Sequence, residues 1–181
     1  MIGRRQSAFW PNAVSRLPTA VILFFIMSQP AILLVGDWQR SEMSPIRAWI
    51  DSLGSQGSVQ QFNQLPAEMI EPPDLVIVCQ SWPDEFSAEE VSAALGRWPL
   101  ALWICCYGAW CDSDGRTRTI WPISLRVPVC DAASRLSHVW QVLTEQRGDP
   151  LPLTASRDEA FAFDHCSSHF IPADASDTLS R

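Results

Sequence analysis

The chain of 181 residues has room for one folded domain of ordinary size together with segments outside it. Its 47% hydrophobic and 18% charged residues are typical of a globular protein and exclude disorder along the whole chain. The net charge is -7, with 13 basic against 20 acidic residues. Because phosphate binding needs clustered cations, which the central part of the chain lacks, we expect no nucleic-acid partner.

Residues 1–29 are expected to form an N-terminal extension. Arginines followed by the apolar run 20–27 are similar to an export signal, but the run is short and no clear cleavage site follows. A membrane anchor would have to join residues 20–36, which include polar residues and a proline and fall short of the roughly 20 apolar residues of a bilayer helix. We favour a third interpretation, a start at Met27 instead of Met1, and expect a cytoplasmic protein.

Residues 30–146 show the alternation of strands and helices that is typical of an α/β domain. The apolar run 31–36 (AILLVG) ends in Asp37 and predicts a parallel strand that is buried on both faces. Ser44 as N-cap and Pro45 as first helical residue then predict a helix with apolar residues at i, i+3, i+4 and i+7, closed by Gly54.

Two further strands are predicted in the next part of the chain. Residues 58–63 (SVQQFN) are polar, which is typical of an edge strand, whereas residues 74–79 (DLVIVC) repeat the buried pattern. Between them, residues 66–71 leave space for only one or two helical turns before a pair of prolines. The second helix is therefore expected to be short or missing.

Ser87 and Glu90 form a capping box that predicts a third helix, and residues 99–106 (PLALWICC) predict a fourth strand. Residues 107–122 contain Gly, Asp, Thr and Trp without helical periodicity, so a loop is expected to replace the fourth helix. A fifth strand is expected at residues 124–129.

Asp131 is expected to cap a last helix that runs to about residue 143. This alternation predicts a doubly wound α/β sandwich of three layers, with a five-stranded parallel sheet in the order 2-1-3-4-5. Residues 147–181 are expected to be a flexible C-terminal tail that docks through Phe161 and Phe163.

The stretch 73–83 (PDLVIVCQSWP) resembles the third strand and following loop of the receiver domains of bacterial response regulators. The resemblance covers about residues 30–143 and implies a flavodoxin-like fold. In that family the strand ends at an aspartate that accepts a phosphoryl group, and a proline follows four residues later. These two positions are Cys79 and Pro83 here, so the resemblance is to a degenerate receiver.

The remaining phosphorylation residues of the family also have no full counterpart. Asp37 stands alone where receivers hold magnesium with an acidic pair, and Cys105 or Cys106 falls near the family's hydroxyl residue. No lysine occurs between residues 125 and 131. Because phosphoryl transfer to this family's site needs a carboxylate, a hard cation and cationic help, we expect neither aspartyl phosphorylation nor a bound cofactor or metal.

Cysteine chemistry gives an alternative, because the carboxyl ends of parallel strands converge at one crevice. Cys79, Cys106 and Cys130 end predicted strands near Asp37, and Cys111 lies in the following loop. A small thiol- or metal-dependent enzyme that uses Cys79, Cys106 and Cys111 is therefore the alternative hypothesis. No CxxC pair occurs, and buried cysteine often serves as a small apolar side chain, so we favour packing by reduced cysteines.

Other metal-like patterns are weaker. The motif HCSSH contains His165 and His169 at a spacing that could place two imidazoles on one helical face, although histidine pairs in polar tails are common. Asp112 and Asp114 resemble the start of a calcium loop, but its closing glutamate is missing and a tight turn explains them better.

Nine tryptophans in this chain include several in predicted loops, where a large aromatic side chain covers a surface or meets a partner. The expected interaction face consists of Asp37, Cys79, Trp82, Cys106, Trp110 and Trp121. The leading hypothesis is a non-catalytic pseudo-receiver that binds a protein in bacterial signalling. Alternatively, the loop tryptophans only pack the long loop onto the sheet.

Overall fold

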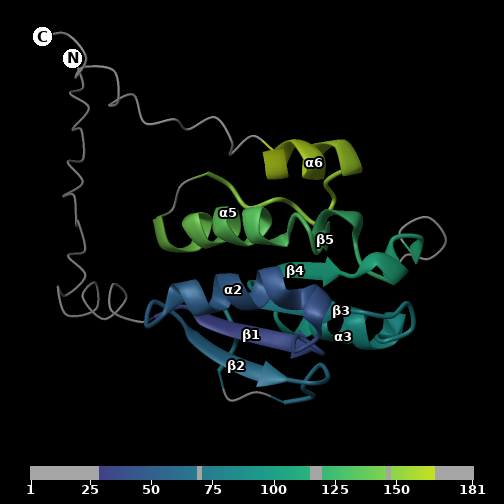
Figure 1. Cartoon of the computed structure of the whole chain (residues 1–181), viewed down its shortest axis with the longest axis horizontal. Coiled ribbons are helices and arrows are strands. Elements are labelled where there is room, and N and C mark those ends of the chain that lie inside the picture. Colours follow the sequence, from purple (N-terminus) through teal and green to yellow (C-terminus); the bar gives the residue numbers. More distant parts are fainter. Residues whose placement is uncertain (1–28, 69–70, 115–119, 146–147, 166–181) are drawn as a thin grey trace, which may run out of the picture.

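The structure, a computed structural model, describes residues 29–68, 71–114, 120–145 and 148–165 (Figure 1). These residues form one five-stranded parallel sheet in the order β2-β1-β3-β4-β5, as the sequence pattern predicted. The strands are β1 (Ala31–Gly36), β2 (Ser58–Phe62), β3 (Leu75–Gln80), β4 (Leu102–Tyr107) and β5 (Arg126–Pro128).

Burial along the strands follows the apolar runs of the sequence. Every residue of β3 is buried, because helices or loops cover both faces of the central strand. The polar strand β2 is largely exposed at the edge of the sheet. Since all strands are parallel, their carboxyl ends share one edge, here called the carboxyl edge, where Gly36 is in register with Cys79 and Cys79 with Cys106.

Four α-helices lie in the described part of the chain, namely α2 (Ser44–Leu53), α3 (Ala88–Arg97), α5 (Ala132–Glu145) and α6 (Arg157–His165). Helices α2 and α5 cover one face of the sheet and α3 covers the other, which gives the three expected layers (Figure 1). Helix α6 lies outside this sandwich against α5 (Figure 1).

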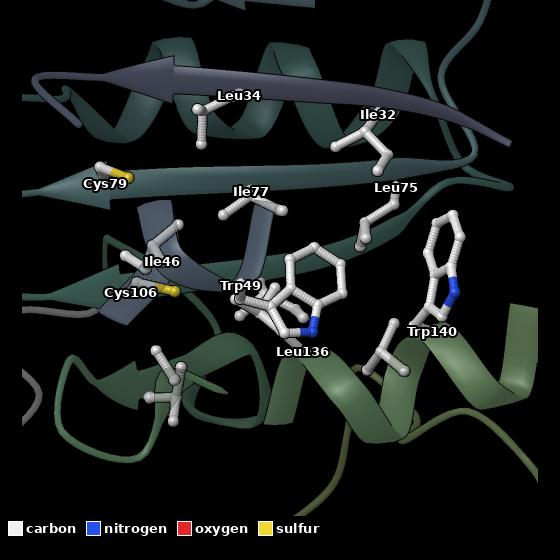
Figure 2. Close-up of a cluster of buried hydrophobic side chains, with 14 of the residues drawn as sticks. Ile32, Leu34, Ile46, Trp49, Leu75, Ile77, Cys79, Cys106, Leu136 and Trp140 are labelled. Carbon is white, nitrogen blue, oxygen red and sulfur yellow. The ribbon is translucent and has the colours of Figure 1, made fainter. Parts of the chain in front are cut away.

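The face under α2 and α5 has a regular apolar core (Figure 2). Aliphatic side chains of β1 and β3 meet Ile46 of α2 and Leu136 of α5 there. Trp49 and Trp140 close this layer edge to face, with ring centroids 5.9 Å apart. Two helices therefore fill this face of the sheet.

The opposite face has only α3 as a described helix and is completed by aromatic side chains. Between β4 and β5, the chain forms two short 3-10 turns, Ala109–Cys111 and Ile123–Leu125, with residues 115–119 outside the described part. Trp98, Trp103 and Trp121 are buried on this face. Large indole rings thus supply much of the apolar volume on the face that α3 covers.

Of the predicted helix starts, that of α3 is right and that of α2 is displaced. Ser87 caps α3 with the expected capping box, in which Ser87 Oγ accepts from the Glu90 N–H and Glu90 Oε2 accepts from the Ser87 N–H. Ser44, expected as an N-cap, is instead the first residue of α2 after Met43. A 3-10 turn, Ser41–Met43, leads directly into this helix, so no side-chain cap is made.

Helix α6 lies within the segment that we expected as a tail, and its docking is largely polar. Arg135 of α5 is buried and forms an ion pair with Asp164, and it also donates to the Ser124 carbonyl at 2.8 Å. Phe163 stacks on His138 with ring centroids 4.0 Å apart, whereas Phe161 is 62% exposed. Only Phe163 of the two expected phenylalanines therefore docks.

Residues 1–28 lie outside the described part, so the interpretations of the N-terminal extension stay predictions. Residues 31–36, which a membrane anchor would require, form β1. Among the described residues, no helix has the length and apolar character needed to cross a bilayer.

Candidate functional site

A glycine at the end of β1 shapes the carboxyl edge. Gly36 has φ +96°, and a Cβ atom at this position would lie 2.3 Å from the Cys79 carbonyl oxygen, so only glycine fits. The chain turns there and leaves Asp37 exposed, with its Oδ2 accepting from Arg40 Nε at 2.9 Å. Asp37 therefore lies at the edge, as predicted, but within a surface ion pair.

Buried Gln80 is bonded to both loops, through its side chain to the loop after β3 and through its backbone to the loop after β4. Its Nε2 donates to the Trp82 carbonyl at 3.0 Å and to the Pro83 carbonyl at 3.4 Å. The Gln80 backbone carbonyl accepts from the Gly108 N–H at 2.8 Å. Gln80 is only 1% exposed, so these bonds lie in a place with little water and hold the two loops in a defined relation.

Trp82 and Trp110 lie at the tips of these loops and stack on each other. Their ring centroids are 6.1 Å apart, with 23° between the ring planes. Trp82 is 45% exposed and Trp110 is 68% exposed, and the Arg40 guanidinium lies 5.1 Å from the centre of the Trp82 ring. We call Trp82 and Trp110 the exposed tryptophan pair.

The loop of Trp82 has a second polar support. Glu85 Oε2 accepts from the Ser81 N–H at 2.7 Å and from the Trp82 N–H at 3.2 Å. A carboxylate that accepts two backbone bonds fixes the turn before α3. Hydrogen bonds of Gln80 and Glu85 therefore hold the loop that carries Trp82.

Trp121, the third tryptophan of the expected interaction face, is not part of this surface. It is 3% exposed and packs under the sheet against Phe86, edge to face at 5.9 Å, and against Trp103 at 6.2 Å. For Trp121 the alternative interpretation, packing of the long loop onto the sheet, is the correct one. The residue fills space beside β4 on the face that α3 covers.

The cysteines are distributed over both faces of the sheet. Cys79 and Cys106 are neighbours on β3 and β4 and point into the core under α2 and α5 (Figure 2). Cys105 points to the opposite face, Cys111 is buried in the loop after β4, and Cys130 is exposed. The expected crevice thus brings Cys79 and Cys106 together below the surface but does not gather all the thiols.

Burial makes these thiols poor nucleophiles. Loss of solvent, with a smaller contribution from Glu85 and Asp37, raises the pKa of Cys79 to about 12. Burial likewise raises the pKa of Cys111 to about 12 and the pKa values of Cys105 and Cys106 well above that of a free thiol. Since the thiolate is the reactive form, these four side chains stay protonated at neutral pH.

A hollow of about 470 Å³ lies at the ends of β1 and β2, and it is lined by Gly36, Asp37, Trp38, Gln39, Asn63 and Glu85. Asp37 and Glu85 each contribute a carboxylate residue to this lining. In the described part of the chain, however, no three histidine, cysteine or acidic side chains are grouped to hold a metal ion. His169 of the HCSSH motif lies outside the described residues.

The receiver's lysine has no counterpart anywhere, because all 13 basic residues of this chain are arginines. No protein-family model, curated protein or solved structure matches the chain. The fold is therefore established from the coordinates, while the receiver resemblance rests on the sequence pattern around Cys79.

Sequence reasoning missed Arg40, Gln80 and Glu85. A signal existed for Arg40, which is three residues after Asp37, and for Glu85, which stands near the start of α3. For Gln80 there was none, because a glutamine at the end of a strand is usually exposed and its burial depends on two loops that come together only in the fold.

Proposed function

We propose that this chain is a non-catalytic, receiver-like module that binds another protein through the exposed tryptophan pair. The observation that carries the proposal is the stacking of Trp82 and Trp110 at a surface where both rings remain open to solvent. Exposed aromatic residues that are held rigidly lose little conformational entropy on binding, and tryptophan is enriched at the energetic centres of interfaces.

The non-catalytic part of the proposal is supported by what occupies the position of the receiver's aspartate. A fully buried thiol with a pKa of about 12 stands there, and the neighbouring carboxylate Asp37 is engaged with Arg40. The thiol-enzyme alternative needs an activated thiolate, so the raised pKa values rank it lower. Bacterial signalling and a cytoplasmic location fit a receiver-like chain whose described cysteines are all free.

Capture from a lysate of the source cells tests the binding surface, with the full chain as bait. The native chain and a Leu100→Ala variant should retain the same partner, and Trp110→Ala should lose it. Leu100 is the matched control, because it is 95% exposed and belongs to the loop before β4, at the opposite edge of the sheet. Equal capture by the native and Trp110→Ala chains would refute the proposed surface.

Incubation with acetyl phosphate and magnesium tests the non-catalytic part. The intact mass should not change, because no carboxylate stands at the end of β3. An added phosphoryl group on an aspartate would contradict the proposal.

A further inference from the structure

Carboxylates surround the exposed tryptophan pair. Glu85 bonds the Trp82 N–H, and the Glu42 carboxylate lies against Gly108, so close that a Cβ atom there would be 2.8 Å from Glu42 Oε2. Asp37 lies beside Arg40, which contacts the Trp82 ring. Cys111 directly follows Trp110. Burial raises its pKa, and the negative charges of Asp114, Glu85 and Glu42 raise it further.

The described cations at this edge are already engaged. Arg40 is paired with Asp37, and Arg47 donates to the carbonyl of Gln39, which lines the hollow. Arg126 donates to the Cys111 carbonyl at 2.7 Å and lies 4.4 Å from the centre of the Tyr107 ring. Asp37 and Glu85, two of these carboxylates, also line the hollow that adjoins the loop of Trp82. In the described part of the chain, the exposed tryptophan pair thus lies among several carboxylates.

The chain's own Arg40 shows how such a surface takes a cation. Its guanidinium lies over an indole ring while its Nε bonds a carboxylate at 2.9 Å. Trp110 presents a larger open surface, 68% exposed, with Glu42 near the start of its loop. An arginine or lysine from outside would find the same combination of ring face and carboxylate there.

We infer that the partner presents a basic peptide segment, whose arginine or lysine side chains lie on Trp110 beside the Glu42 carboxylate. The inference rests on the proposed function and specifies its partner by charge. Charge complementarity carries it, because the overall charge of -7 and the local carboxylates favour a cationic segment over an acidic or neutral one.

Titration calorimetry on the full chain tests this with three capped peptides of equal length. One alternates glycine and arginine, one alternates glycine and glutamate, and one is a neutral proline-rich peptide. Only the arginine peptide should bind, and its affinity should fall several-fold between about 50 and about 300 mM NaCl because the carboxylates are screened. Trp110→Ala should weaken it about tenfold and Glu42→Gln about threefold.

Asp51→Asn is the matched control, because it removes the same charge from an exposed position on α2, and it should leave the affinity unchanged. Preference for the glutamate or proline-rich peptide would contradict the inference of a basic partner. Binding of the arginine peptide that is unchanged by both Trp110→Ala and Glu42→Gln would contradict it too. If capture of the natural partner still depends on Trp110 in that case, the proposed function stands and only the partner class is wrong. If capture is also independent of Trp110, both fail.

Discussion

Two pairs of stacked tryptophans in this molecule have nearly the same geometry and opposite surroundings. Trp98 and Trp103, here called the buried tryptophan pair, have ring centroids 5.9 Å apart and an interplanar angle of 25°, against 6.1 Å and 23° in the exposed tryptophan pair. The buried rings are 6% and 7% exposed, whereas Trp82 and Trp110 are 45% and 68% exposed.

An arginine accompanies each pair. The Arg97 guanidinium lies 5.5 Å from the centre of the Trp98 ring, as Arg40 lies 5.1 Å from that of Trp82. Ring geometry alone therefore does not separate a structural pair from a binding surface. The two pairs differ in their exposure to solvent. The buried pair loses contact with water when the chain folds, whereas the exposed pair would lose it only when a partner binds.

The largest expected difference is in stability. Trp103→Ala should lower the free energy of unfolding by about 3–5 kcal/mol, because it opens a cavity beside β4 among Trp98 and Trp121. Trp110→Ala should lower it by only about 0.5–1.5 kcal/mol, which is the contribution of the lost stacking. Urea unfolding of both variants measures the difference, and Trp103→Phe should recover part of the loss. Equal losses would remove the distinction between the two pairs.

The supports of the exposed pair should give the next effect. Gln80→Met keeps the volume but removes the donor to the Trp82 and Pro83 carbonyls, which should lower the free energy of unfolding by about 1–3 kcal/mol. Gln61→Met, at an exposed position of β2, is the matched control and should be nearly neutral.

Heteronuclear NMR of the two glutamine variants distinguishes a local from a general effect. The Trp82 and Trp110 indole signals should shift in Gln80→Met, whereas the Trp98 and Trp103 signals should stay close to those of the native chain. Shifts confined to the buried pair would mean that Gln80 does not hold the exposed one.

The sheet was predictable from sequence because continuous apolar runs such as residues 31–36 and 74–79 have few other uses than strands buried on both faces. The site was only partly predictable. Position after a strand placed Asp37, Trp82 and Trp110 at the carboxyl edge, but the same rule placed Trp121 there. Trp121 is buried because it packs against Phe86 and Trp103 on the face that α3 covers, and that packing depends on the whole layer.

Helix α6 marks the other limit of prediction. Only Ala160 is buried among its nine residues, so the helix has no apolar stripe of the kind that predicts a packed helix. Its position depends on Arg135 of α5, whose partner Asp164 is 29 residues away in the chain. A pairing of this kind leaves no local pattern, so sequence reasoning alone predicts a tail in this segment.

The smallest effects should come from the two arginines, and salt should separate them. Arg40→Met and Arg97→Met should each lower the free energy of unfolding by no more than about 1 kcal/mol. The loss in Arg40→Met should nearly vanish at about 1 M NaCl, because its partner Asp37 is half exposed and their attraction is screened. Arg97 donates to the neutral Pro66 carbonyl at 2.6 Å, so its loss should persist. Urea unfolding at low and high salt measures the loss in each variant. The same salt response in Arg40→Met and Arg97→Met would show that the Arg40–Asp37 ion pair does not distinguish the exposed tryptophan pair from the buried one.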